Sequence, residues 1–528
     1  MGSLLREREG ASEAVDALLD SARDGRGGVV FIEGDAGLGK SSILESAMQR
    51  AQGDLRIGLG QGDAMEMSLP FGVLDQALSM LGVQALLGES PAPVGRTEHL
   101  YRLLRWLDGE TQGVLIALDD LHWADSDSLE LLALLSRRIG TLGTAIVATM
   151  RSWPEAAREI AVNLVGSGVA QMVRLAPLSR EGATAMLVER AGCPVSDATA
   201  ARAWELCAGN PLLVEQVASA IDRGAIDASA DDTLPPLKAD ALLLSRFAGL
   251  PGFALRCVRA ASVLGVRFQP DVAAEVAGLT ALETDRAIEA LGRSGLVEQA
   301  SPEGVRFVHP LFAQALYDDL PGPMRARLHA RSFDVLSRRG LDAEAAEHAI
   351  RAGLRDADVV GSLERAGRAA LRVGALGTAA VQLTAAVELA GDRAESTLLM
   401  EQGTALLRSG EPIAASEAYG RVLSRAEDDP AVRPAALRMR GRALHAAGDH
   451  VAAAACFTDA VDLMLPADPL AAAETLIDQA MSMHIVMGPS GSLPLATRAI
   501  ELAVGADERL RLRAEAAHGY LAVMAGDP

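Results

Sequence analysis

The chain of 528 residues is too long for a single hydrophobic core, so we expect about three or four domains. Its residues are 49% hydrophobic but only 3% aromatic, a composition that favours packed helices over β-sandwiches. The net charge of −21 argues against a general electrostatic grip on nucleic acid, and the four cysteines share no metal-ligand spacing. The sequence has no apolar run of about eighteen residues and no apolar N-terminal region, so we expect a cytoplasmic protein without a membrane contact.

The first informative segment is residues 34–42, which read Gly-Asp-Ala-Gly-Leu-Gly-Lys-Ser-Ser and fit the phosphate-binding pattern G-x-x-x-x-G-K-[ST]. A buried strand is predicted over residues 28–33 and a helix over residues 42–50. In this setting the glycines let backbone N–H groups surround a phosphate chain at a helix N-terminus. Lys40 would reach the β and γ phosphates, and the hydroxyl of Ser41 would bind Mg²⁺. The residues expected to bind ATP or ADP here are Gly34, Gly37, Gly39, Lys40, Ser41 and Ser42.

A second apolar run, residues 114–118, ends in two acids, Asp119 and Asp120. A central parallel strand delivers side chains in this way to the carboxyl edge of a sheet. We expect Asp119 to hold Mg²⁺ and Asp120 to orient or deprotonate an attacking water molecule. Paired acids also occur in ordinary solvated turns. Downstream, Asp127 and Glu130 are interpreted as the cap of a helix that runs to Arg138.

A third predicted strand, residues 144–149, is followed closely by Arg151. An arginine near a strand end beside the γ-phosphate can sense which nucleotide is bound. The same position also suits an ordinary surface arginine, and the spacing alone does not separate the two readings.

The segment Leu118-Asp-Asp-Leu-His-Trp-Ala-Asp125, together with residues 34–41, resembles the STAND class of signalling ATPases. Within that class the chain is most similar to the large ATP-binding LuxR-type transcriptional regulators. The resemblance implies that the segment Arg6-Glu-Arg-Glu9 helps to hold adenine and that Pro211, in Gly209-Asn-Pro211, packs on the base. It also implies that His309, in Phe307-Val-His-Pro310, contacts the β-phosphate of ADP and locks a closed state. Without the resemblance, a lone histidine is more often structural.

The resemblance also implies a multidomain fold. We expect an α/β P-loop NTPase domain with a parallel sheet over residues 1–176 and a helical lid over residues 177–235. A linker near residues 231–236 would lead to a winged-helix domain over residues 236–338, which serves as an internal switch element. Residues 339–528 would form an all-α array of tetratricopeptide-like repeats.

The array is predicted from a repeat in the sequence itself. Glycines recur at 36- and 38-residue intervals, and each is followed five positions later by an alanine that lets the next helix pack closely. A generic alanine-rich bundle is the alternative. The final segment resembles an inter-helix turn, so we expect a truncated array. The repeating positions are Gly374, Gly410 and Gly448, with Ala379, Ala415 and Ala453.

These features predict an ATP-dependent signalling switch from a transcriptional regulator, with slow hydrolysis. A signal or partner protein bound by the array would open the closed ADP state and favour exchange for ATP and self-association. DNA would be bound only through a module outside this chain. Two alternatives are the regulatory part of a signalling enzyme such as a nucleotide cyclase, and a repeat scaffold with a nucleotide site that does not hydrolyse.

Overall fold

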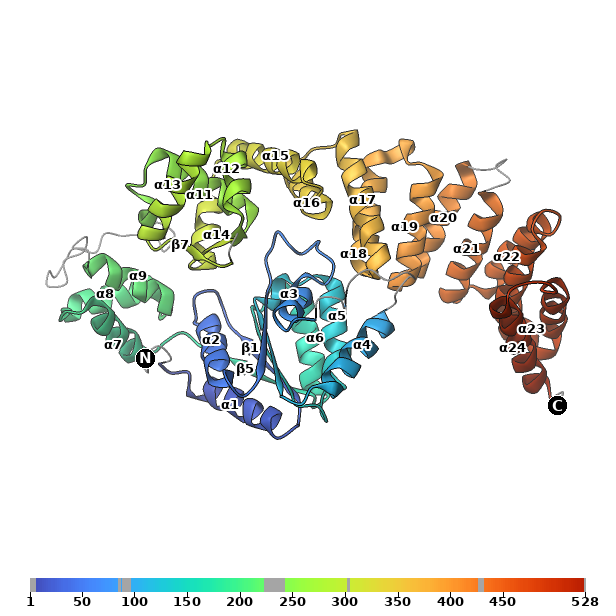
Figure 1. Cartoon of the computed structure of the whole chain (residues 1–528), viewed down its shortest axis with the longest axis horizontal. Helices are drawn as coiled ribbons and strands as arrows, with labels where there is room; N and C mark the ends of the chain where they lie inside the picture. The colour runs from blue at the N-terminus through green and yellow to red at the C-terminus, as the bar shows by residue number, and fades with distance from the viewer. Residues whose placement is uncertain are drawn as a thin grey trace. The chain divides into compact units, whose positions relative to one another are not determined.

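A computed structural model describes residues 6–83, 87, 96–222, 243–301, 304–425 and 432–526 (Figure 1). The chain falls into two compact units, Met1–Arg355 with Arg372–Ala375, and Asp356–Leu371 with Leu376–Pro528. The predicted linker at residues 231–236 lies outside the described residues, so the four domain boundaries stay predictions. No helix within the described part of the chain is long and apolar enough to cross a membrane.

The first unit contains a sheet of parallel strands in the order β2-β3-β4-β1-β5. Strands β3 and β4 are buried along their whole length, as expected for a parallel sheet that is covered on both faces. Helices α1 and α2 pack on one face through a core that includes Val15, Ile43 and Val147, and Figure 1 shows α5 and α6 on the other side. The strands are β1 (Gly28–Glu33), β2 (Arg56–Gln61), β3 (Val114–Asp119), β4 (Thr144–Met150) and β5 (Ala170–Arg174). The helices are α1 (Glu9–Arg23), α2 (Lys40–Ala51), α3 (Gly72–Met80), α4 (Arg96–Gly109), α5 (Ser126–Ser136) and α6 (Glu155–Gly166), with a 3-10 turn at Leu121–Trp123.

The predicted strands agree with the observed ones to within one residue, but the predicted cap of α5 is wrong. The capping side chain is that of Asp125, which accepts the backbone N–H of Ser128 at 2.8 Å. It also accepts the backbone N–H of Phe71 at 3.1 Å, so it ties the start of α5 to the start of α3. The helix ends at Ser136, two residues before the predicted end at Arg138.

The rest of the first unit is a helical segment and a small mixed segment. Helices α7, α8 and α9 follow the sheet and share a core with the mixed segment. The mixed segment combines α11 to α14 with an antiparallel sheet in the order β6-β8-β7, and its assignment as a winged helix stays a prediction. The bounds are α7 (Arg180–Ala191), α8 (Asp197–Cys207), α9 (Pro211–Asp222), a 3-10 turn at Ser245–Phe247, α11 (Gly252–Leu264), β6 (Arg267–Phe268), α12 (Pro270–Ala277), α13 (Ala281–Arg293), β7 (Val297–Gln299), β8 (Val305–Phe307), α14 (Pro310–Asp319), α15 (Gly322–Arg338) and α16 (Asp342–Ala352).

The second unit is a helical array, and its glycines occupy the predicted turns. Gly410, with φ 97°, ends α19 in the left-handed region that favours glycine. A second series of glycines lies inside three helices of the array, and a Cβ on one of them, Gly403, would lie 2.7 Å from the ring of Tyr419. Tetratricopeptide-like packing therefore follows from paired small and large residues. The helices are α17 (Ala357–Val373), α18 (Leu376–Ala390), α19 (Ser396–Ser409), α20 (Pro412–Arg425), α21 (Arg433–Ala446), α22 (His450–Met464), α23 (Pro469–Leu502, with a break at Gly488) and α24 (Glu508–Ala525), with a 3-10 turn at Gly391–Arg393. The turn glycines Gly374, Gly410 and Gly448 have φ values of 75°, 97° and 88°, and Ala379, Ala415 and Ala453 are fully buried.

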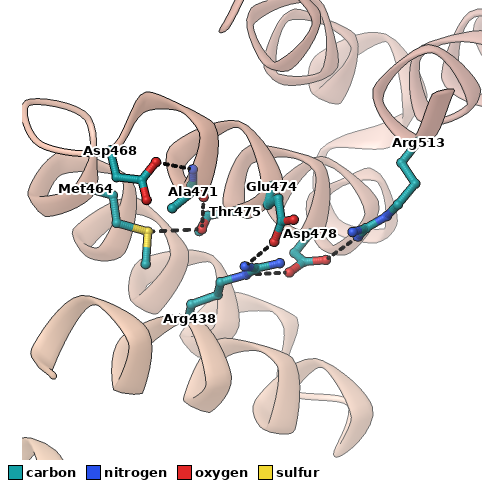
Figure 2. Close-up of polar contacts among 8 residues, drawn as sticks. All are labelled: Arg438, Met464, Asp468, Ala471, Glu474, Thr475, Asp478 and Arg513. Carbon is teal, nitrogen blue, oxygen red and sulfur yellow. Dashed lines mark hydrogen bonds and ion pairs between the residues drawn. The ribbon is translucent and has the colours of Figure 1, made fainter. Parts of the chain in front are cut away.

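Ion pairs join neighbouring hairpins of the array, as Figure 2 shows for α21, α23 and α24. The guanidinium of Arg438, which is 17% exposed, donates to Glu474 at 2.6 Å and to Asp478 at 3.0 Å. Arg513 lies 3.8 Å from the other oxygen of Asp478. Arg438 and Asp478 are largely shielded, at 17% and 15% exposure, so their ion pair adds a polar contact between α21 and α23 to the packing of the apolar side chains.

Candidate functional site

The predicted phosphate loop connects β1 to α2 and has the backbone that its glycines allow. Gly37 and Gly39 have φ values of 81° and 87°, which side chains other than glycine rarely adopt. Gly39 directly precedes the first turn of α2, so backbone N–H groups at the start of this helix border the site. Gly34 lies at the base of the loop, where its N–H donates to the carbonyl of Met150 at 3.1 Å.

Lys40 opens α2 and is 5% exposed. Its Nζ donates to the carbonyl of Asp35 at 3.0 Å, so the side chain folds over its own loop. Burial lowers the pKa of Lys40, and the charge of Arg151 lowers it further, whereas the nearby charges of Asp120 and Asp119 raise it. The ammonium group is thus a cation that interacts electrostatically with the carboxyl groups of Asp119 and Asp120.

The two predicted acids lie at the carboxyl end of β3, and β4 separates this strand from β1. Oδ1 of Asp119 accepts the hydroxyl of Thr149 at 2.5 Å, from the corresponding end of β4. The backbone N–H of Asp120 also donates to Thr149 Oγ1, at 2.9 Å. Asp120 has φ 50°, and this left-handed turn carries the chain away from the strand directly after the acids. Burial raises the pKa of Asp120 to about 7, with a further contribution from the charge of Asp119.

Two side chains behind the acids were not identified from the sequence. Thr149 is fully buried, and its place follows from the register in which Leu118 pairs with Ala148. His122 is 3% exposed, and neither of its ring nitrogens has a hydrogen-bond partner among the described residues. Its Nδ1 lies 3.8 Å from Asp120 Oδ1, and burial lowers its pKa to about 3, so the ring is neutral. The one signal for Thr149 in the sequence is a polar side chain at the end of the apolar run over residues 145–148.

One cavity of about 600 Å³ collects most of the predicted residues from three parts of the chain. The phosphate loop and the acids form one wall, α9 forms another, and the segment from β8 to α14 forms a third. Arg151 reaches the cavity from the end of β4, and His309 reaches it from the start of α14. The predicted residues that line it are Gly37, Gly39, Lys40, Ser41, Ser42, Asp119, Asp120, Arg151 and His309.

His309 lines this cavity with a defined tautomer. Its Nδ1 accepts the backbone N–H of Leu311 at 3.2 Å and thereby caps α14. Burial lowers its pKa to about 4, so the ring is neutral at pH 7. A neutral imidazole whose Nδ1 accepts must carry its proton on Nε2, and His309 therefore offers one N–H donor.

Pro211 and Gly34 do not line the main cavity. Pro211 lines an adjoining cavity of about 100 Å³, which also includes Arg6, Arg8 and His309. The N-terminal segment and the lid proline, which the resemblance assigns to adenine, therefore lie around one small space. Gly34 instead packs against the β5–α7 connection, where a Cβ would come within 3.2 Å of Leu175 Cβ.

Asn210, which precedes α9, makes a contact that was not predicted from the sequence. Its Nδ2 donates to the carbonyl of Ala36 at 2.8 Å, and its Oδ1 accepts the N–H of Leu212 at 3.1 Å. The N–H of Leu212 also reaches the carbonyl of Gly37 at 3.3 Å. Helix α9 is thus seated directly on the phosphate loop, and a Cβ on Gly37 would lie 2.5 Å from Asn210 Oδ1.

The donor set of the cavity fits Mg²⁺ held mainly by nucleotide and water. Ser41 offers a hydroxyl oxygen and Asp119 a carboxylate oxygen, both hard ligands. No group of three or more acidic, histidine or cysteine side chains that could hold a metal ion occurs in the described ranges. Magnesium commonly keeps waters and phosphate oxygens as its other ligands, so two protein oxygens suffice.

Comparison with known proteins supports an ATPase domain. Residues 4–147 match the profile of the AAA ATPase domain family. The chain is 26% identical over 460 residues to an uncharacterized protein of Rhizobium meliloti (strain 1021), a match that covers 75% of this chain and 44% of that protein. The N-terminal part of the chain is thus a P-loop ATPase domain, and a helical repeat region follows later in the sequence.

Two solved structures are similar over large parts of the chain. One is a STAND protein with a tetratricopeptide repeat sensor from Pyrococcus horikoshii, with 14% identity, coverage of 97% of this chain and 92% of that chain, and a TM-score of 0.39. The other is Cdc6p from Pyrobaculum aerophilum, with 16% identity, coverage of 60% and 96%, and a TM-score of 0.34.

Proposed function

We propose that the chain is a nucleotide-dependent signalling switch that binds ATP and ADP with Mg²⁺. The observation that carries the proposal is the shared cavity, whose walls come from the phosphate loop, from α9 and from the segment around His309. A ligand bound there touches all three and stabilises the arrangement that brings them together. The binding free energy of a nucleotide can therefore control the arrangement of these segments.

The phosphate groups would be held by the N–H groups of the loop and by Lys40. The Lys40 ammonium donates to the Asp35 carbonyl at 3.0 Å, so a bound phosphate would compete with this carbonyl for the ammonium group. Arg151 is available as a second cation, because its Nε is buried without an acceptor among the described residues. His309 would donate its Nε2 proton to a phosphate oxygen, and only this third contact depends on the position of α14.

Hydrolysis would be slow. Asp120 would accept a proton from the attacking water. Because its pKa is raised to about 7, Asp120 is already protonated in a fraction of the molecules near neutral pH, and it cannot act as a base in that fraction. Bound Mg²⁺ would neutralise charge that develops on the phosphates. Thr149 holds Asp119 through a short hydrogen bond, so the carboxylate is oriented before any ligand binds.

Regulation would come from the helical array as a sensor for a signal or partner protein. We propose that its engagement opens the ADP state and that the ATP state self-associates. Motif order in the sequence supports a role in transcription regulation of the LuxR type, with DNA bound through a module outside these 528 residues. The fixed donor set around Asp119 and Asp120 favours this switch over a scaffold that does not hydrolyse.

Binding of a fluorescent ADP analogue tests the proposal. Lys40→Ala should weaken binding at least about tenfold, since it removes a charge-assisted contact in a buried site. Arg137→Ala, which removes an exposed positive charge directly after α5, is the control and should leave binding unchanged. Nucleotide affinity that survives Lys40→Ala would contradict the proposal.

Two further variants separate the switch from a passive nucleotide site. His309→Ala should speed ADP release while leaving the loop and its acids in place. Asp120→Asn should abolish hydrolysis yet keep ADP binding. Equal turnover in Asp120→Asn and the unaltered chain would favour the scaffold alternative instead.

A further inference from the structure

The loop after β2 carries a buried carboxyl group that lies outside the nucleotide cavity. Asp63 is 6% exposed and is not among the residues that line that cavity. Its Oδ1 accepts the backbone N–H of Met65, in the same loop, at 2.9 Å. Its Oδ2 accepts the backbone N–H of Val266, directly before β6, at 2.6 Å and across 203 residues of sequence. This carboxyl group therefore joins the loop beside the parallel sheet to the mixed segment of α11 to α14.

Gly265 shows how closely the loop and the mixed segment approach at this contact. It ends α11 with φ 124°, a backbone conformation that residues with a side chain rarely adopt. A Cβ at this position would lie 2.6 Å from Asp63 Oδ2, so a side chain there would displace the carboxyl group. Burial of a carboxyl group costs free energy unless N–H donors compensate for the lost water. Separation of the two segments would remove the donor that Val266 supplies.

The loop is also in direct contact with the turn that carries the two acids. The N–H of Gly62 donates to the carbonyl of Asp119 at 2.8 Å, and a Cβ on Gly62 would overlap the carbonyl oxygen of Asp120. Gln61, the last residue of β2, pairs with Asp119 in the sheet and lines the nucleotide cavity. The backbone of the loop is thus held against the edge of the cavity that carries the acids.

Val266 is connected in turn to the segment that carries His309. The carbonyl of Val266 accepts the N–H of Phe307 at 2.9 Å. Phe307 ends β8, and His309, two positions later, caps α14 and lines the cavity. A series of hydrogen bonds therefore runs from the acid turn through Asp63 and Val266 to the end of the strand before His309.

We propose that Asp63 is a positioning residue of the nucleotide site, which holds the mixed segment where His309 can reach a phosphate oxygen of ADP. This inference rests on the proposed nucleotide switch and names one contact that regulates it. Asp63 does not touch the nucleotide and acts through His309. Because binding linkage is reciprocal, ADP bound to His309 stabilises the contact between Asp63 and Val266, and loss of that contact weakens the hold on ADP.

Release of a fluorescent ADP analogue from the full chain, chased with excess unlabelled ADP, tests this role. Asp63→Asn preserves the shape but replaces one acceptor oxygen with an amino group, so the N–H of Met65 or of Val266 loses its acceptor. A buried donor without an acceptor costs enough free energy to make release about tenfold faster. Asp285→Asn, which changes an exposed carboxyl group on α13 of the same segment, is the matched control and should release ADP at the unaltered rate.

The double variant Asp63→Asn/His309→Ala distinguishes positioning from general destabilisation. His309→Ala removes the contact through which Asp63 acts, so adding Asp63→Asn should then change the release rate by less than about twofold. A purely structural role would instead multiply the two effects. Multiplied effects, or a release rate for Asp63→Asn equal to that of the Asp285→Asn control, would overturn the assignment.

Gly265→Ala perturbs the same contact from the mixed segment and leaves Asp63 unchanged. It should also speed ADP release about tenfold, because the added Cβ competes for space with Asp63 Oδ2. The matched control is Gly249→Ala, which has a φ of 83° but no surrounding atom within 4 Å of the added Cβ, and which should release ADP at the unaltered rate. Equal release rates for the two glycine variants would count against the proposal.

Hydrogen exchange of the unaltered chain tests the same contact without any variant. ADP should slow exchange of the Val266 N–H at least about fivefold and leave the amides inside α13 unaffected, because hydrogen bonds within that helix do not depend on the contact. Equal exchange of Val266 with and without ADP would refute the role of Asp63. A chain that binds no ADP would overturn the switch as well. A chain that loses ADP in Lys40→Ala but keeps the unaltered release rate in Asp63→Asn would overturn only the role of Asp63.

Discussion

The contact between the start of α9 and the phosphate loop predicts the effect of Asn210→Ala on nucleotide affinity. Asn210 joins the two parts through its hydrogen bond to the carbonyl of Ala36 at 2.8 Å. Losing that bond costs about 1 kcal/mol. Asn210 also caps α9, and a missing cap costs about 1 kcal/mol more, because the first turn frays and the contact of Leu212 with Gly37 is lost.

The two contributions set the range of the expected effect. The inter-segment bond alone predicts about fivefold weaker binding of ADP, and both terms together predict about thirtyfold, since 1.36 kcal/mol corresponds to a tenfold change. Equilibrium titration with a fluorescent ADP analogue measures this directly. Asn163→Ala, on the exposed face of α6, is the matched control. An affinity for Asn210→Ala within twofold of the control would refute the view that α9 must be seated on the loop.

Two other predictions concern stability. Gly403→Ala places a Cβ 2.7 Å from the ring of the fully buried Tyr419 and should destabilise the array by about 1–2 kcal/mol, whereas Gly420→Ala, with only ordinary contacts, should stabilise α20 by about 1 kcal/mol. Chemical denaturation of the two variants checks the opposite signs. The pKa values of His329 and His348 are lowered to about 4 and about 3, so their neutral forms stabilise the fold at pH 7 and this stability falls as pH drops below about 6.5. For one histidine the loss is about 2 kcal/mol by pH 5, and urea titrations at pH 7 and pH 5 should show a smaller loss for His348→Asn than for the unaltered chain; equal losses would contradict the assignment.

Local patterns predicted the strands and the phosphate loop because the determining residues are adjacent in the chain. Glycines at positions 37 and 39 permit the left-handed backbone that the loop needs. Strand β3 is a continuous apolar run that ends in acids, as a buried parallel strand does. Turn glycines and their partner alanines predicted the array for the same reason. These elements can be predicted without knowledge of the rest of the fold.

Long-range contacts could not be predicted from such patterns. The sequence placed Asp119 and Arg151 at strand ends, but it did not show that β4 lies between β1 and β3. That order is what brings Thr149 into contact with Asp119 and places Arg151 between the loop and the acids. The bond from Asn210 to Ala36 spans 174 residues, and no local periodicity encodes it. The cap of α5 was misplaced because Asp125 and Asp127 are both residues that favour helix starts, and the contact of Asp125 with Phe71, 54 residues away, is not visible in the local pattern.

Charge in the nucleotide cavity gives a final reason to connect the site with switching. The cavity holds paired groups, such as Arg306 with Glu298 at 2.6 Å, which balance each other without a ligand. Lys40 and Arg151 form no direct ion pair within the described residues, so neither cation has to give up an ion-pair partner to reach phosphate oxygens. Both lie beside the parallel sheet, Lys40 on α2 and Arg151 after β4, whereas the start of α14 offers the neutral donor His309. In the proposed switch, a nucleotide would bind mainly to the first side and gain a weaker contact from the second. A signal that breaks the weaker contact would then open the cavity while the nucleotide stays bound to the loop, which is the energetic balance that we propose for this switch.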